Sequence, residues 1–221
     1  MNTEDLRRIL TERAAKCIRL AQPHLDSGEY FLAGSSISTP EINDIDIYPA
    51  GDKPFVIPSA HRIDTKSLNS VTVRNDPNPP LQFCRYQKPT LQALITSFDF
   101  SHVQTGAHIR DGQVINVQWT DSFVFAGAAR TTKFEGSDYP LASAIRLLKY
   151  HKRGEMARQT AMVSMLEIVE AIVSRGFKDY DDFKDQLDAV DLGLVPEDVE
   201  AIEQAGLVRL FERLVHNGAT K

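Results

Sequence analysis

The sequence predicts an α+β fold, in which a mixed β-sheet with flanking helices is followed by a helical C-terminal region. Two observations favour it. Between residues 30 and 119, short apolar or alternating runs are separated by turn-forming residues, a pattern typical of strands. In residues 3–22 and 140–175 the apolar residues instead recur at helical spacing. No flexible linker separates the two patterns, so we expect an α/β domain over residues 1–138 packed against a helical domain over residues 139–221.

The first element is expected to be a helix over residues 3–22, which Thr3 can cap and Pro23 follows. A strand and turn are predicted at 30–36. Strands are predicted at 44–50, 70–76, 81–86, 98–109 and 113–119, the last two of them forming a hairpin around Asp111-Gly112. Residues 51–66 are predicted as loop, 89–97 as a short helix and 121–134 as extended or mixed structure. Further helices are predicted at 140–153, 158–175, 179–189 and 196–215.

Composition narrows the class of protein. Apolar residues make up 42% of the chain, enough for a core, but no apolar run approaches the ~20 residues of a membrane helix. The start of the chain is acidic and no signal-peptide pattern follows it, so we expect a cytoplasmic protein with no membrane partner. Cys17 and Cys84 lack paired spacing and the six histidines form no metal-binding pattern, which favours reduced thiols over a disulfide or a zinc site.

Charge is distributed unevenly along the chain. The net charge of −5 argues against a protein that coats nucleic acid non-specifically. Residues 130–153 nevertheless hold six basic residues against two acids, a local charge of +4. Residues 176–203 hold ten acids against two lysines, a local charge of −8. We interpret this acidic segment as a solvated helical surface, with a site for a cationic acceptor as the alternative.

Two aspartates share one face of a predicted strand. In “NDIDIY”, Asp44 and Asp46 would project together, roughly 6.6 Å apart, while the intervening isoleucines face the core. Two neighbouring carboxylates repel each other, and such a pair persists where a divalent cation binds it. Oxygen ligands without nearby histidine or cysteine favour Mg²⁺ or Mn²⁺. Asp99, in an apolar run predicted as a strand, is the candidate for a third carboxylate that would converge on the same metals.

A glycine-serine turn precedes the aspartates. Gly34 permits close backbone approach, and the hydroxyl of Ser35, with the amides that follow it through Ser36, can hold the phosphates of a nucleotide.

The residues from Ala33 to Tyr48 resemble the signature of a known family. “AGSSISTPEINDIDIY” resembles the signature of the DNA polymerase β-type nucleotidyltransferase superfamily, in which an apolar residue, Gly-Ser and a short spacer precede Asp-apolar-Asp-apolar. “YPLASAIRLLKYHKRG” is similar to the helix that follows the head domain in the CCA-adding and poly(A) polymerase branch. The resemblance covers residues 28–155. It implies that Asp44, Asp46 and Asp99 are catalytic and bind metal, and that Gly34, Ser35 and Ser36 bind nucleotide.

The reaction implied is the transfer of NMP from an NTP, with ATP as the expected donor, to an acceptor hydroxyl, with Mg²⁺ or Mn²⁺ as cofactor and pyrophosphate as product. An RNA 3′ end is the first acceptor to consider. An aminoglycoside-like small molecule and a protein side chain are the alternatives. A nucleotide- or RNA-binding module without turnover is a further alternative of a different class, and the sequence leaves the oligomeric state open.

The helix predicted at 140–153 carries a basic stripe. Arg146, Lys149 and Arg153 fall at i, i+3 and i+7, and the helix contains no acid to neutralise them. They could be a solvated face, but their place after the predicted sheet indicates that Arg146 and Lys149 contact a triphosphate or an acceptor phosphate. Arg130 and Lys133 are weaker candidates of the same kind.

Other Asp-x-Asp proteins fit less well. An aspartyl-phosphatase motif ends a long apolar strand, whereas Glu41-Ile42-Asn43 precedes this pair. An EF-hand needs more oxygen ligands and a glycine at fixed spacing. A glycosyltransferase would leave the glycine-serine turn unexplained.

Overall fold

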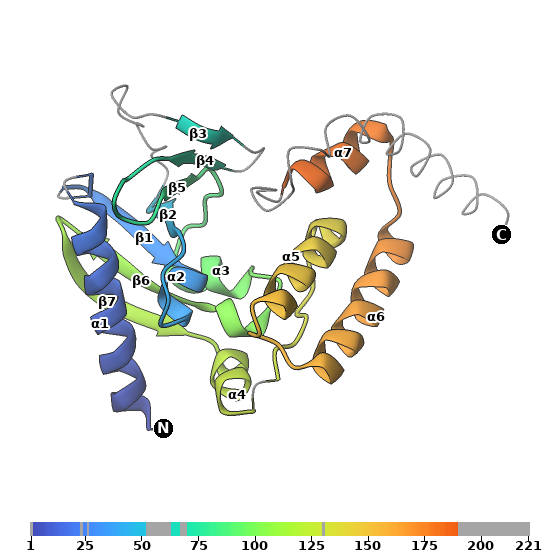
Figure 1. The fold of residues 1–221 in the computed structure, drawn as a ribbon, viewed down its shortest axis with the longest axis horizontal. Coiled ribbons are helices and arrows are strands. Elements are labelled where there is room, and N and C mark those ends of the chain that lie inside the picture. The colour runs from blue at the N-terminus through green and yellow to red at the C-terminus, as the bar shows by residue number, and fades with distance from the viewer. Residues whose placement is uncertain are drawn as a thin grey trace, which may run out of the picture.

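The computed structural model describes residues 2–189 apart from Pro23, Asp26, 52–62, 67–69 and Arg130 (Figure 1). Its strands are β1 Glu29–Ala33, β2 Ile45–Pro49, β3 Ile63–Lys66, β4 Ser70–Val73, β5 Leu81–Cys84, β6 Thr105–Arg110 and β7 Gln113–Trp119. Its helices are α1 Thr3–Ala21, α2 Ser35–Ser38, α3 Leu91–Thr96, the 3₁₀ helix η1 Ser101–Val103, α4 Asp121–Ala129, α5 Pro140–Lys152, α6 Arg158–Arg175 and α7 Tyr180–Asp188. None of the helices in these ranges is long and apolar enough to cross a membrane.

The described strands form one mixed sheet in the order β3-β4-β5-β2-β1-β6-β7. β2 and β5 are parallel, and the other neighbours are antiparallel. Asp111 and Gly112 join β6 to β7 with φ values of 49° and 71°, the left-handed pair that a tight hairpin turn requires. The α+β class predicted from the sequence, with a mixed sheet and flanking helices, is confirmed.

The two faces of the sheet have different coverings. α1 contributes its apolar stripe to a core that also contains Leu32, Ile45 and Ile47. On the opposite face Phe31 and Ala33 pack with α3. Because side chains alternate along a strand, residues next to the buried isoleucines of β2 face the α3 side. Figure 1 shows the sheet between α1 at one end of the molecule and α5 to α7 at the other.

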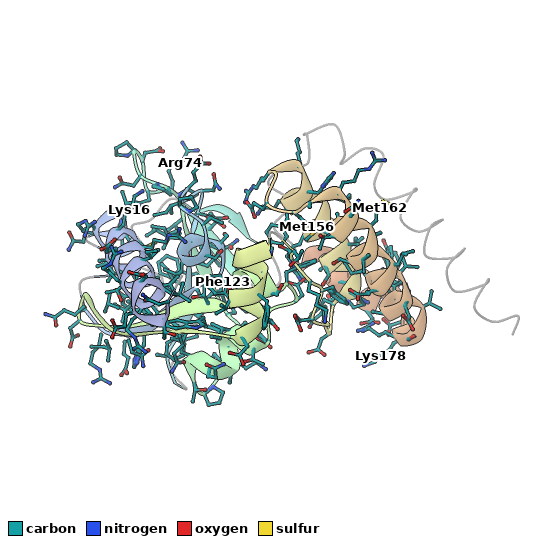
Figure 2. All side chains as sticks on the ribbon, turned by 90° about the horizontal axis from the view of Figure 1, so that it is seen from below. Lys16, Arg74, Phe123, Met156, Met162 and Lys178 are labelled. Carbon is teal, nitrogen blue, oxygen red and sulfur yellow. The ribbon has the colours of Figure 1, made fainter. Side chains whose placement is uncertain are left out.

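A second apolar cluster joins the sheet part to the helices. Phe100 and Val103, which follow α3, pack with Leu147 and Tyr150 of α5 and Ile168 of α6. Met156, which belongs to the same cluster and is labelled in Figure 2, lies where the helices meet the sheet part. The two parts therefore pack together as expected, while the division into domains at residues 138 and 139 stays a prediction.

Two of the predicted elements are wrong. Residues 98–109 do not form one strand, because Phe100 pairs only briefly with Phe134 before η1 turns the chain. The Gln104 side chain also donates to the Phe98 carbonyl at 2.9 Å, which stabilises the bend, so the strand begins only at Thr105. Residues 121–129, expected to be extended or mixed, form α4, whose first turn is capped by the Thr120 hydroxyl accepting from the Phe123 amide at 3.1 Å.

Smaller differences concern ends and caps. Asn2 rather than Thr3 caps α1, because its Oδ1 accepts from the Asp5 amide at 2.8 Å. Residues 63–66, predicted as loop, form β3. The helix predicted at 196–215, the part of the acidic segment beyond Ala189, and Arg130 lie outside the described residues.

Candidate active site

A sharp turn joins β1 to α2. Gly34 adopts φ 81°, a conformation that a residue with a side chain rarely takes, and its amide donates to the Thr105 carbonyl at 3.1 Å. A Cβ at this position would lie 3.3 Å from Oδ2 of Asp46. The glycine therefore allows the carboxylate of β2 to lie directly against the backbone of the turn.

The two serines after this glycine differ in their surroundings. Ser35 lines the cleft described below. Ser36 is buried, and its Oγ donates to the Ala33 carbonyl at 3.2 Å. In this structure the Ser36 hydroxyl ties α2 to β1 and lies outside the described cleft lining.

The aspartate pair is arranged as strand alternation predicts. Ile45 and Ile47 of β2 are fully buried in the core, and Asp46 lies on the opposite face, with Asp44 just before the strand. Both aspartates line one cleft. Oδ1 of Asp44 is buried and accepts no hydrogen bond from any described residue. A buried carboxylate oxygen without a partner is costly, and a cation would satisfy it.

The other groups of the cleft suit a hard cation. Cys84 is the one cysteine that lines it, and burial raises the pKa of this thiol well above its usual value, so it stays neutral and is a poor ligand. No histidine is found among the described lining residues. The donors that line the cleft are therefore oxygens, the carboxylates of Asp44 and Asp46 among them, and Mg²⁺ and Mn²⁺ prefer oxygen ligands. Within the described ranges, however, no three Asp, Glu, His or Cys side chains gather as a ligand set.

Asp99 lines the same cleft, from the irregular segment between α3 and η1. Its Oδ2 accepts from Oγ of Ser143 at 2.7 Å and from Nε of Arg146 at 2.8 Å, and lies 2.7 Å from Nη2 of the same arginine. Asp99 is 7% exposed. Its charge is balanced by the guanidinium of Arg146, and among the described residues it does not complete a ligand set of three. The convergence of the three carboxylates on metal stays a prediction.

Arg146 is held firmly in its charged form. Burial opposes the charge, but the adjacent carboxylate of Asp99 outweighs it, so the pKa of Arg146 is raised. The nearby phenol of Tyr150 stays neutral, because burial raises its pKa strongly. The cleft thus contains a permanent positive charge on α5, across from the Asp44–Asp46 pair.

The cleft has a volume of about 360 Å³, within the range of small-molecule sites. One wall is formed by the β1–α2 turn and by the sheet face of β2, β4 and β5. The other is formed by the end of the 131–139 segment and by α5, whose Arg146 and Lys149 line it together with Arg153 just beyond the helix. The predicted basic stripe therefore faces the cleft. Lys133 is exposed and is not part of the described lining.

Some lining residues were not singled out from the sequence. Gln82 of β5 is in register with Asp46 of β2, so the two side chains lie next to each other on the same face. Its Nε2 is 3.4 Å from the Thr72 hydroxyl on β4. Tyr48, Tyr139 and Tyr150 also line the cleft. The alternation of “LQFC” shows which way Gln82 faces, but the pairing of β5 with β2 has no local signal.

His102 packs between Glu155 and Tyr150. Its Nε2 lies 3.5 Å from Oε2 of Glu155, and its ring packs edge-on against Tyr150 with centroids 4.4 Å apart. It lies outside the described cleft lining.

No protein-family model and no curated protein matches this chain. Among solved structures, a Thermotoga maritima CCA-adding enzyme complexed with tRNA is similar over 81% of this chain, with a TM-score of 0.46 and 10% identity. The matched part is 49% of that enzyme, so this chain spans about half its length.

Proposed function

We propose that this protein is a metal-dependent nucleotidyltransferase, which transfers NMP from an NTP to an acceptor hydroxyl and releases pyrophosphate. One observation carries the proposal. The Asp44–Asp46 pair, with an unsatisfied buried oxygen, lies against the Gly34 turn and across one cleft from a cationic helix. Phosphoryl chemistry needs this combination, because it depends on positioning and on the stabilisation of negative charge.

The carboxylate pair would hold Mg²⁺ or Mn²⁺. A divalent cation there would neutralise the repulsion within the pair and polarise the phosphate oxygens of the nucleotide. Ser35 and the backbone after Gly34 would bind the triphosphate from one side of the cleft. In the reaction, the acceptor oxygen bonds to the α-phosphorus, the bond from that phosphorus to pyrophosphate breaks, and the hydroxyl proton passes to a carboxylate of the cleft.

Arg146 and Lys149 would bind the phosphates from the other side. An arginine already oriented by a carboxylate loses little freedom when it binds an anion. In the arrangement observed, Asp99 contributes to the reaction through Arg146. The metal-binding role that the family resemblance implies for Asp99 would require this ion pair to open.

For the acceptor, the cationic end of α5 favours an anionic polymer. Lys149, Lys152 and Arg153 gather there, and Arg158 follows at the start of α6. Lys152 and Arg158 are exposed, so they are free to contact phosphates beyond the cleft. We therefore propose an RNA 3′ end as the first acceptor to test, ahead of a small molecule or a protein side chain.

The reaction is tested with purified protein, MgCl₂, each α-labelled NTP, and either cellular RNA or a cell extract. Label that moves to RNA, and that is lost in Asp44→Asn and Asp46→Asn but kept in the exposed control Asp185→Asn, supports the proposal. Label on a small molecule or a protein supports the reaction and changes the acceptor.

A non-catalytic nucleotide-binding module is the second candidate, and it is favoured by the pairing of Asp99 with Arg146, which leaves two carboxylates for the metal. Thermal stabilisation by NTP and Mg²⁺ without any release of pyrophosphate would support the module and overturn the transferase.

A further inference from the structure

α6 is a helix with apolar residues on more than one side. Ile168 and Ser164 are buried, and Met165 and Ile172 pack into the cluster shared with α5. A helix that is apolar on several sides is normally buried on several sides. The contact with α5 accounts for only one of them.

The other side of α6 carries an exposed apolar stripe. Its members are Met162, Leu166, Val169 and Val173, at i, i+4, i+7 and i+11, with exposed fractions of 61%, 70%, 48% and 75%. Met162 lies on the part of the molecule away from the sheet (Figure 2). Half of the large apolar residues that are exposed in the described ranges belong to this one helix, where Val163 adds a fifth. A contiguous exposed patch of this kind marks an interaction surface.

The chain continues from α6 into α7, and Ala189, just after α7, lines the cleft. α7 is tied to the end of α6, because Nη2 of Arg175 lies 2.7 Å from Oδ1 of Asp182. It is tied to the start of α5 as well, because Oε1 of Gln186 accepts from the Leu141 amide at 3.2 Å. Residues 190–221, which lie outside the described residues, follow directly.

The sequence of residues 196–215 also contains apolar residues at helical spacing. After Pro196, Val199, Ile202, Leu210 and Leu214 recur at helical spacing, with acidic and basic residues between them. From Ala189 to Pro196 the connection is seven residues, which can span up to about 23–25 Å. A helix is about 10–12 Å across, so this length exceeds the width of one helix.

We propose that the apolar stripe of α6 is the docking surface for residues 196–215 of the same chain, which cover it as an amphipathic helix. The argument for the chain's own segment over a second copy is the tether. A short tether gives an effective concentration in the millimolar range, which exceeds the concentration of free protein in solution.

The test uses the full chain with Leu166→Cys and measures the rate of labelling by a maleimide. Ile115→Cys on β7 is the matched control, because Ile115 is 48% exposed and lies on another element. The native thiols give little background, since both are buried and burial raises the pKa of Cys17 to about 12.

If residues 196–215 cover the stripe, labelling of Leu166→Cys is at least about tenfold slower than that of the control. Adding Leu210→Asp restores fast labelling, and the rate does not depend on protein concentration. Labelling of Leu166→Cys as fast as the control overturns the proposal. Protection that grows with protein concentration overturns it in favour of a second copy. Protection that Leu210→Asp leaves unchanged also overturns it, because another surface then covers the stripe.

Discussion

The cleft is lined by carboxylates in two contrasting settings. Just before β2, Oδ1 of Asp44 accepts no hydrogen bond from the part of the chain that the structure describes, and Asp46 lies against the Gly34 turn. A few residues after α3, one oxygen of Asp99 is surrounded by donors from Ser143 and Arg146. The first site includes a buried carboxylate oxygen of Asp44 with no hydrogen bond from the described residues, whereas Asp99 is paired with the guanidinium of Arg146. The difference teaches that similar residues, in similar apolar runs of the sequence, need not have the same task.

The contrast between the Asp44–Asp46 pair and Asp99 is tested most strongly by removing the negative charge of Asp46. In Asp46→Asn, transfer should fall by at least about 100-fold, because even changes behind a metal ligand cost 10–100-fold. The metal-free protein should not lose stability, because asparagine keeps a hydrogen-bond acceptor at this position while the repulsion between the two carboxylates is relieved. NMP-transfer rates and thermal unfolding in EDTA measure both effects. A variant that is inactive and also unfolds more easily without metal would show that Asp46 holds the fold together.

The second prediction removes the other carboxylate. Asp99→Ala leaves the half-buried guanidinium of Arg146 without its partner and should destabilise the protein by about 3 kcal/mol in urea unfolding. Asp99→Asn retains a hydrogen-bond acceptor and should cost less.

Metal affinity separates the two roles of Asp99. Binding of Mn²⁺, followed by its electron paramagnetic resonance signal, should be unchanged in Asp99→Asn and lost in Asp44→Asn. If Asp99→Asn weakens Mn²⁺ binding tenfold or more, the carboxylate is a metal ligand, and the contrast drawn between the two settings is wrong.

The third prediction adds a carboxylate next to Asp46. Gln82 lies next to Asp46 on the adjacent parallel strand, about 4.8 Å away along the sheet. Gln82→Glu should lower the melting temperature without metal, because a third negative charge joins the pair, and should increase the rise in melting temperature on adding Mn²⁺. Thermal scans with and without Mn²⁺ measure this. Gln92→Glu, exposed on α3, is the control and should show neither change.

Local patterns were enough to predict the first setting. The turn at Gly34 and the alternation around Asp46 depend on residues that are close together in the sequence, and the basic stripe of α5 follows from helical spacing. The setting of Asp99 was not predictable in this way, because its partners Ser143 and Arg146 lie 44 and 47 residues further along the chain. The bend after Phe98 depends on a side chain of Gln104 that a strand pattern does not reveal. The neighbour of Asp46 on β5 depends on a parallel pairing, which only the folded sheet determines.

The fourth prediction concerns an Asp–Arg pair near the surface, where we expect the smallest effect on stability. Arg175 forms two hydrogen bonds, of 2.8 and 2.7 Å, with the carboxylate of Asp182, and they lower the pKa of Asp182 from 3.8 to about 2. A carboxyl with a lowered pKa contributes stability above its ordinary value and loses it as the pH falls through the lowered one. Solvent screening limits this contribution to about 1 kcal/mol.

Stability should therefore decline between pH 4 and pH 2 by this amount more in the native protein than in Asp182→Asn. Urea unfolding at a series of pH values measures the difference. An acid-induced loss as large as that caused by Asp99→Ala would mean that burial does not distinguish the two ion pairs. The buried carboxylate of Asp99 would then need another explanation for its place in the cleft.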